Sequence, residues 1–269
     1  MCLTPVSIPV YNSLGELQSY QNVPCNHCQE CLAERRRHWT HRLYYENFFS
    51  LSSFFLTLTY DNEHLPLDGL SKRDCQLFFK RLRKRVGKFR YFLVSEYGDQ
   101  FSRGHYHCLI FFNKVVRLSD IVRATESAWQ NGFIKVGDVN VKSIQYCSKY
   151  CLKEKNDGGY SLNLETGEVV EHINTFSLMS RNPGIGSQLL SWPEWLKSHT
   201  KGDGVFKDVV FDKVVSLPRY YRDKIFTDLQ KIKHRERIAE KYSGKGLDSF
   251  DQRARGREFL ESINKRSRR

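Results

Sequence analysis

The sequence predicts an α+β fold in which an antiparallel sheet carries helices packed on one face, an arrangement of the split βαβ type. Three observations lead to this prediction. Strand-like and helix-like patterns between residues 53 and 154 follow the order β–α–β–β–α–β–α. The two strand patterns in the middle are separated only by a short turn, as in a hairpin. The chain has 269 residues and is 40% hydrophobic, so it can bury a core.

The N-terminal part of the chain is expected to contribute one helix. Residues 1–24 show no regular period and are expected to be irregular. From Cys28 to about Asn47 the pattern is helical, because apolar and long side chains recur at near-helical spacing. The stretch SFFLTLTYD at 53–61 then alternates like a strand.

A helix and a pair of strands follow. Ser71, with Asp74 three residues on, resembles a capping box and predicts a helix through about Arg85. Strands are expected at about 90–97 and 105–112, with turn residues between them. These two strands form the predicted hairpin.

The remaining core elements are a helix, a strand and a second helix. Ser119 is expected to cap a helix that runs to Trp129, and the NG pair at 131–132 breaks it. The stretch FIKVGDVNV at 133–141 has the pattern of a strand, and 142–154 has that of a helix. They complete the predicted order.

The pattern weakens beyond residue 155. NDGGYSLNLETGE predicts a loop or a hairpin tip, and RNPGIGSQLL predicts a turn that enters a helix. From about residue 218 the chain is charged and expected to be helical. The sequence thus divides into an N-terminal cysteine cluster and helix packed on the core (1–50), the core (51–155), loop and accessory elements (156–217) and a basic helical C-terminal extension (218–269).

The charge of the chain points to a polyanionic partner. The formal net charge is +13 and the sequence pI is about 9.4. Positive charge is concentrated in KRLRKRVGKFR at 80–90 and in the C-terminal stretch from residue 234. Nucleic acid fits this distribution better than an acidic membrane surface, because no amphipathic anchor accompanies the charge.

Compartment and membrane association are read from the same sequence. No apolar run approaches the roughly 18 residues of a membrane span, and the N-terminus lacks a signal-peptide pattern. The eight cysteines are not spaced as a secreted disulfide set. We therefore expect a soluble, unexported protein with reduced thiols and no membrane partner.

Two histidines and a glutamate are candidates for a metal site. His105 and His107 lie one residue apart in GHYHC, so they share a face of the predicted strand. Glu96 lies near the end of the preceding strand and can reach them if the two strands form a hairpin. Two imidazoles and one carboxylate leave open positions on a divalent ion. The alternative is that the histidines are polar residues on a solvated sheet face.

Two tyrosines are candidate nucleophiles. Tyr146 and Tyr150 lie four residues apart in VKSIQYCSKYCLKEK, so they share a helical face, with Lys149 beside them. In isolation such tyrosines are usually packing residues. Beside a metal site, a tyrosine hydroxyl can attack a phosphodiester and hold the 5′ end of DNA as a phosphotyrosine.

Three stretches together carry a family resemblance. FLTLTY (55–60), GHYHCLIFF (104–112) and YCSKY (146–150) stand in the motif order of replication initiators. On these motifs the chain resembles an HUH-type rolling-circle replication initiation endonuclease. More narrowly, PCNHCQECLAERRRHW (24–39), SRNPGIG (180–186) and SLPRYYRDKI (216–225) resemble the replication initiator of gokushovirus-type microviruses.

The resemblance implies a role for each candidate residue. It implies that Tyr146 and Tyr150 are nucleophiles, and that Glu96, His105 and His107 bind Mg²⁺ or Mn²⁺. Lys149 is expected to orient the phosphate or to lower the effective pKa of a tyrosine. Residues expected to contact the nucleic acid are Thr57, Thr59, Arg103 and Lys153.

The resemblance also implies rolling-circle replication in the cytoplasm of a bacterial host. The enzyme would nick single-stranded origin DNA, leave a 3′ hydroxyl for a host polymerase and later rejoin the displaced strand. The sequence shows no G-x-x-x-x-G-K-[ST] loop, so a host helicase is the expected partner for strand separation.

A cysteine cluster near the N-terminus is a possible structural zinc site. CNHCQEC places Cys25, Cys28 and Cys31 in two overlapping C-x₂-C units. A second, distant pair of the zinc-ribbon type is missing from this pattern. The fourth ligand would be one of Cys2, His27, His38 and His41. The alternative is three reduced thiols at the start of a helix.

Two other functions are considered. A non-catalytic, RRM-like sheet that binds single-stranded nucleic acid would explain the charge and the aromatic residues. It gives no reason for the glutamate, the histidines and the tyrosines to occur together. An HUH-type transposase would share the metal chemistry but needs only one tyrosine, so the pair favours an initiator.

Overall fold

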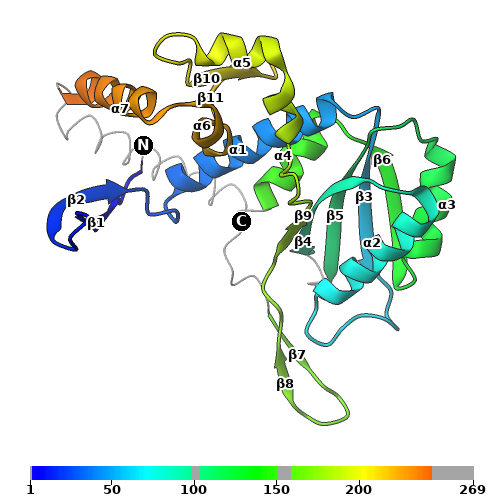
Figure 1. The fold of residues 1–269 in the computed structure, drawn as a ribbon. Coiled ribbons are helices and arrows are strands. Elements are labelled where there is room, and N and C mark those ends of the chain that lie inside the picture. Colours follow the sequence, from blue (N-terminus) through cyan, green and yellow to red (C-terminus); the bar gives the residue numbers. More distant parts are fainter. Residues whose placement is uncertain (1, 99–102, 151–158, 244–269) are drawn as a thin grey trace, which may run out of the picture. The chain divides into compact units, whose positions relative to one another are not determined.

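A five-stranded antiparallel sheet is the centre of the fold (Figure 1). The computed structural model describes residues 2–98, 103–150 and 159–243. Across the sheet the strand order is β6-β3-β5-β4-β9. The strands are β3 (Ser52–Tyr60), β4 (Arg90–Tyr97), β5 (Gly104–Phe112), β6 (Gly132–Asp138) and β9 (Ser177–Met179).

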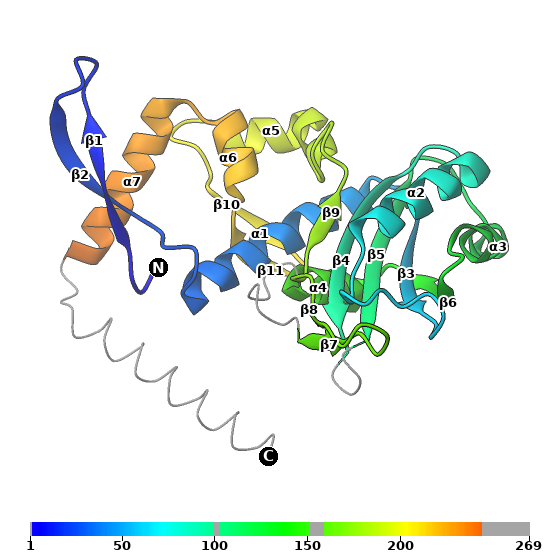
Figure 2. The ribbon, with the colours of Figure 1, turned by 90° about the horizontal axis from the view of Figure 1, so that it is seen from below.

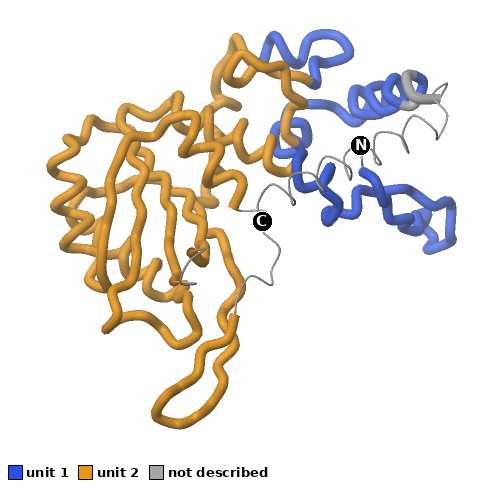
Figure 3. Tube along the Cα trace, turned by 180° about the vertical axis from the view of Figure 1, so that it is seen from behind, with its two compact units in different colours: residues 1–34, 196–206, 219–269 blue, residues 35–195, 207–218 orange. Residues whose placement is uncertain are grey.

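The chain forms two compact units (Figure 3). The larger unit comprises residues 35–195 and 207–218 and contains the sheet. The smaller unit comprises residues 1–34, 196–206 and 219–269. Each unit is described by itself below.

The helices of the larger unit follow the predicted order. They are α2 (Lys72–Val86), α3 (Leu118–Ala128) and α4 (Val141–Tyr150), together with the part of α1 (Gln29–Phe48) that starts at residue 35. With strands β3 to β6 they give β–α–β–β–α–β–α, so the predicted α+β architecture is confirmed.

One face of the sheet packs on α2 and α3. Leu56, Leu58 and Tyr60 of β3 are fully buried there, in one apolar cluster with Phe78 of α2 and Ile121 of α3. The start of α2 is as predicted, because the Ser71 hydroxyl accepts a hydrogen bond from the Asp74 amide (3.1 Å). The predicted cap of α3 is wrong: the N-cap is Arg117, which makes no side-chain capping bond, and Ser119 lies inside the helix.

The opposite face is also covered, by α1 and α4, where the sequence predicts helices on one face alone (Figure 2). Leu43 of α1 and Ile144 of α4 pack with Leu109 and Phe111 of β5. The reason lies in β5, where CLIFF is apolar at every position and is buried throughout. A strand that is buried on both faces needs cover on both.

A buried carboxylate anchors the end of the larger unit. Asp208 lies on β10 (Lys207–Val210), which pairs with β11 (Lys213–Ser216). Its Oδ2 atom lies 2.9 Å from His41 Nε2 and accepts hydrogen bonds from the Tyr45 hydroxyl and the Trp195 indole, both at 3.1 Å. Three elements of the unit therefore meet at one carboxylate.

The remaining elements of the larger unit are short. They are β7 (Tyr160–Leu162), β8 (Val169–Glu171), the 3₁₀ helix η1 (Ser187–Ser191) and the first residues of α5 (Pro193–Thr200). Strands β7 and β8 pair as a hairpin, which confirms the loop or hairpin tip predicted there.

The smaller unit contains a hairpin that the sequence analysis missed. Strands β1 (Val6–Tyr11) and β2 (Leu17–Val23) pair where an irregular segment was expected. Both strands are exposed, so neither shows the alternation that a buried face imposes. The unit also contains α6 (Arg219–Ile225) and α7 (Asp228–Ser243). Within the described residues no helix has the length and apolarity to cross a membrane.

Candidate active site on the sheet

The β4–β5 hairpin brings the three candidate metal ligands onto one face of the sheet. Glu96 is the direct cross-strand partner of His105, and Val94 is the partner of His107. Directly paired residues point to the same side, and so do residues two apart on a strand. Glu96, His105 and His107 therefore share the face that α4 covers.

Strand β3 supplies a hydroxyl to each histidine. Thr59 Oγ1 lies 2.9 Å from His105 Nδ1, and Thr57 Oγ1 lies 3.2 Å from His107 Nδ1. When Nδ1–H donates to the threonine, the lone pair of Nε2 is left for a metal ion. Sequence analysis assigned both threonines to nucleic-acid contact. The structure places their hydroxyls on the imidazole rings, so what they support here is the orientation of the histidines.

Helix α4 brings a tyrosine hydroxyl to the same point. The Tyr146 hydroxyl donates a hydrogen bond to Glu96 Oε2 (2.7 Å) and lies 3.4 Å from His107 Nε2. Glu96 Oε2 is itself 3.2 Å from His107 Nε2. The ring of Tyr150 lies beside that of Tyr146, with centroids 4.6 Å apart. The two tyrosines thus share the helical face that meets the candidate metal ligands.

The electrostatics of the site follow from these contacts. Burial opposes ionisation of Glu96, but hydrogen bonds with His107, Tyr146 and Tyr150 outweigh it and hold the pKa of Glu96 below its usual value. Burial and the bond to Glu96 raise the pKa of Tyr146. Burial and the neighbouring His107 lower the pKa of His105. Glu96 as an anion and His105 as a neutral ring are the protonation states that a metal ion requires.

A glycine keeps the second imidazole accessible. A Cβ atom added at Gly98 would lie 2.8 Å from His105 Nε2, the atom that would bind a metal. Any side chain at this position would therefore crowd the ligand atom. Together with the two imidazoles and the carboxylate, this space fits a divalent ion such as Mg²⁺ or Mn²⁺.

The other predicted site residues have different surroundings. Lys149 is exposed, and its Nζ atom lies 5.4 Å from the centre of the Tyr150 ring. The Arg103 guanidinium donates to the carbonyl oxygen of Tyr60 (2.7 Å) and to Asn62 Oδ1. Lys153 lies outside the described residues.

Sequence analysis missed Phe55 as a neighbour of the site. Its ring stacks on His107, with centroids 5.8 Å apart and an interplanar angle of 13°. Phe55 also lines a hollow of about 290 Å³ beside His107 and Tyr146. The signal was available, because Phe55 lies two residues before Thr57 and must share its face.

The cysteine cluster forms a separate candidate metal site in the smaller unit. The sulfur atoms of Cys2, Cys25, Cys28 and Cys31 all lie within 4.8 Å of one another. Among the candidates for the fourth ligand the geometry thus selects Cys2. The Thr4 hydroxyl donates to Cys25 Sγ and lowers the pKa of that thiol to about 5, whereas burial raises the pKa of Cys31 to about 12. Four thiolates at this spacing could hold a structural Zn²⁺.

The chain is similar to known phage proteins over most of its length. Residues 53–155 match the model of the replication-associated protein ORF2 family. The chain is 33% identical over 228 residues to replication-associated protein VP4 of Bdellovibrio phage phiMH2K, an alignment that covers 77% of this chain and 68% of that protein. It is 26% identical over 252 residues to replication-associated protein ORF2 of Spiroplasma virus 4, with 82% and 75% covered.

Two further similarities are more limited. The chain is 28% identical over 173 residues to replication-associated protein ORF4 of Chlamydia phage 1, which covers 54% of this chain and 43% of that protein. The crystal structure of hypothetical protein ORF119 from Sulfolobus islandicus rod-shaped virus 1 aligns with 41% of this chain and 88% of its own, at 17% identity and a TM-score of 0.28. That structural likeness is too slight to bear on fold or function.

Proposed function

Because the chain belongs to the replication-associated protein ORF2 family of small single-stranded DNA phages, we propose that it nicks single-stranded origin DNA by tyrosine attack. The family places the chain in phage DNA replication. The nicking reaction is inferred from the arrangement of the side chains on the sheet.

The observation that carries the proposal is the position of the Tyr146 hydroxyl. It lies within hydrogen-bond distance of Glu96 and beside His107 Nε2. A tyrosine that served only for packing has no need of a carboxylate and two imidazoles around its hydroxyl. A nucleophile needs its reactive oxygen next to the groups that hold the phosphate in place.

The proposed reaction exchanges one phosphodiester for another. The bond between the tyrosine oxygen and phosphorus forms while the bond between phosphorus and the 3′ oxygen breaks. The proton lost by the phenol is balanced by the proton gained on the new 3′ hydroxyl. The 5′ phosphate stays on the protein as a phosphotyrosine, so the strand can be rejoined by the reverse attack without an external energy source.

Glu96, His105 and His107 are the residues that would hold Mg²⁺ or Mn²⁺. A bound divalent ion would polarise the scissile phosphate and stabilise the charge that develops on it. Thr57 and Thr59 would orient the imidazoles, and Gly98 would keep Nε2 of His105 clear.

Tyr150 is proposed as the second nucleophile. Rolling-circle replication ends a round by cutting the regenerated origin while the first 5′ end is still attached. Tyr150 lies one helical turn from Tyr146, with its ring in contact with that of Tyr146. We expect the free 3′ hydroxyl to be extended by a host polymerase, with a host helicase separating the strands in the bacterial cytoplasm.

A covalent-adduct assay tests the proposal. The protein is incubated with circular single-stranded DNA and Mn²⁺, denatured, and examined for a protein band that carries DNA. The variant with both Tyr146→Phe and Tyr150→Phe is the control. A DNA-linked band in wild type and none in the double variant is the expected result. Wild type without any adduct on phage-origin DNA would leave a non-catalytic, RRM-like binding protein as the better account.

A further inference from the structure

The site face of the sheet continues past the histidines to the edge strand β6. In one row across the sheet, Thr59 pairs with His105 on one side and with Phe133 on the other. In the next row, Thr57 pairs with His107 and with Lys135. Direct pairs share a face, so Phe133 and Lys135 point to the same side as the two histidines.

Strand β6 divides its side chains cleanly between the two faces. Ile134 and Val136 pack against the apolar cluster under α2 and α3. Phe133 and Lys135 point the other way, and 67% of the Phe133 surface is exposed. Since strands lie about 4.8 Å apart, Phe133 is roughly 10 Å from His105 across the sheet.

A hollow adjoins the exposed phenylalanine. It has a volume of about 450 Å³ and is lined by Thr59, Tyr60, Asp61, Asn62, Glu63, Arg103 and Phe133. The wall thus combines an aromatic ring with carboxylate and amide groups. Carboxylates repel a phosphate but accept hydrogen bonds from the amino groups of a base. The chemistry of the hollow suits a nucleobase and leaves the phosphate to Lys135.

From this placement we propose that Phe133 is a stacking platform for one base of the single-stranded DNA next to the nick, and that Lys135 contacts a phosphate of the same strand. This inference rests on the proposed function, because it takes the scissile phosphate to lie at Tyr146 and the histidines. It adds a base-binding position that the motifs do not contain.

Single-stranded DNA is the occupant that the surroundings favour. A single exposed apolar residue is common on protein surfaces and would need no explanation by itself. Here the ring lies in the same row as a candidate metal ligand, with a lysine two residues on and an arginine in the same hollow. A ring beside cations on a sheet face is the combination that binds single strands, in which bases stack and phosphates pair with cations.

The test measures DNA binding apart from cleavage. Affinity for a short fluorescein-labelled single-stranded oligonucleotide is measured by fluorescence anisotropy in EDTA, with wild type, Phe133→Leu, Phe133→Trp and Lys135→Ala. Phe133→Leu keeps an apolar side chain but removes the ring, so it should weaken binding about five- to hundredfold, the range for loss of one stacked base. Phe133→Trp should bind at least as well as wild type. Lys135→Ala should reduce the slope of log affinity against log salt by about 0.7.

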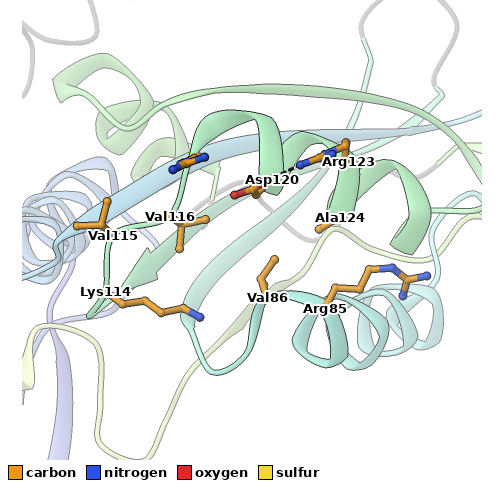
Figure 4. A pocket seen from close by; sticks show the side chains of 9 residues that line it. Arg85, Val86, Lys114, Val115, Val116, Asp120, Arg123 and Ala124 are labelled. Atoms are coloured by element: carbon orange, nitrogen blue, oxygen red, sulfur yellow. Dashed lines mark hydrogen bonds and ion pairs between the residues drawn. The ribbon is translucent and has the colours of Figure 1, made fainter.

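Matched controls come from the far end of the sheet. A basic hollow there is lined by Arg85, Lys114, Arg117 and Arg123 around Val86, Val115, Val116, Asp120 and Ala124 (Figure 4). Lys114→Ala removes the same charge as Lys135→Ala. Val115→Ala changes an apolar residue that is 80% exposed. Both controls should affect binding less than the β6 variants do.

Each outcome decides one point. If Phe133→Leu binds as wild type does, the stacking platform is wrong. If Lys114→Ala lowers affinity as much as Lys135→Ala, the lysine contributes only general charge, and its assignment is wrong. The proposed function fails separately: a wild type that binds through Phe133 but forms no covalent adduct with Mn²⁺ would keep the platform and refute nicking.

Discussion

The Tyr146 hydroxyl donates a 2.7 Å hydrogen bond to Glu96, a residue that would also bind the metal ion. The bond joins α4 to β4 and sets the carboxylate between the proposed nucleophile and the imidazole of His107. The carboxylate raises the pKa of Tyr146, because a phenolate beside it would meet a like charge. A cation that engaged Glu96 would remove this obstacle to attack.

The tyrosine pair predicts different outcomes for single and double variants. Tyr146→Phe and Tyr150→Phe should each keep some covalent attachment to an origin oligonucleotide, because the partner hydroxyl lies within one helical turn. Neither single variant should make repeated rounds of circular product, and the double variant should form no adduct. Denaturing gels measure the adduct, and circle formation over time measures the repeated rounds. Normal multi-round activity of Tyr150→Phe would make Tyr150 a packing residue.

Removal of the candidate metal ligands should abolish nicking without unfolding the protein. His105→Ala and His107→Ala each remove an imidazole from a partly exposed position on the sheet. Cleavage of an origin oligonucleotide should fall to background, while circular dichroism and binding to single-stranded DNA stay close to wild type. EDTA should have the same effect on wild type, and added Mn²⁺ should restore cleavage. Full cleavage by a variant that lacks both histidines would refute the metal site.

The threonines predict an effect on metal affinity rather than on the fold. Thr59→Val keeps the shape of the side chain but removes the partner of His105 Nδ1. Loss of such an orienting group typically lowers metal affinity about ten- to hundredfold. Electron paramagnetic resonance of free Mn²⁺ titrated with DNA-free protein measures this directly. Thr59→Ser is the control and should bind Mn²⁺ nearly as wild type does, whereas equal affinity in Thr59→Val would deny the hydroxyl an orienting role.

Asp208 predicts how stability depends on pH. Burial raises the pKa of Asp208, but hydrogen bonds from His41, Val209 and Trp195 outweigh it and bring the pKa below the ordinary value of 3.8. A carboxyl whose pKa is lower in the folded state stabilises the protein above pH 3.8, and this stabilisation is lost as the pH falls through the folded-state pKa.

The Asp208→Asn variant checks this sign. It keeps an acceptor oxygen but loses the charge, so at neutral pH it should be less stable than wild type by about 1–3 kcal/mol. The difference should shrink from about pH 4 downward, where wild type also loses the charge. Denaturant unfolding at several pH values measures both. A constant difference across this range would show that the charge of Asp208 contributes nothing.

The cysteine cluster predicts one tightly bound zinc ion per chain. Elemental analysis of purified protein should find it, and Co²⁺ substitution should give the absorption of a thiolate-bound tetrahedral site. Cys28→Ser should lose the metal and lower the melting temperature, because zinc binding contributes to folding. Cys75→Ser, a change at a buried cysteine outside the cluster, should keep the zinc. Metal-free protein with an unchanged melting temperature would leave four reduced thiols.

Much of the fold could be predicted because the core elements obey one periodicity each. The strand limits at 90–97 and the Ser71 cap follow from local pattern and turn chemistry, and the structure agrees with both. The β1–β2 hairpin could not be predicted in this way, since exposed strands leave no alternation of burial in the sequence. Cover on the second face was foreshadowed by the unbroken apolar run of β5.

The site was predictable where its members are close in sequence. The spacing of His105 and His107 gives their common face directly. Pairing between strands is a long-range property, so the contacts of Thr57 and Thr59 with the imidazoles could not be derived from β3 alone. The same limit hid Phe133, which is distant from His107 in the sequence and meets the site only through β3.

Strand β3 has almost no position that is free to vary. Leu56, Leu58 and Tyr60 fill the core on one side, while Phe55, Thr57 and Thr59 serve the histidines on the other. A shift by one residue would exchange the two sets and bring leucines against the imidazoles. An insertion or deletion in this strand is therefore a loss-of-function lesion even where every side chain is retained, and an engineered variant of this protein should take its changes elsewhere.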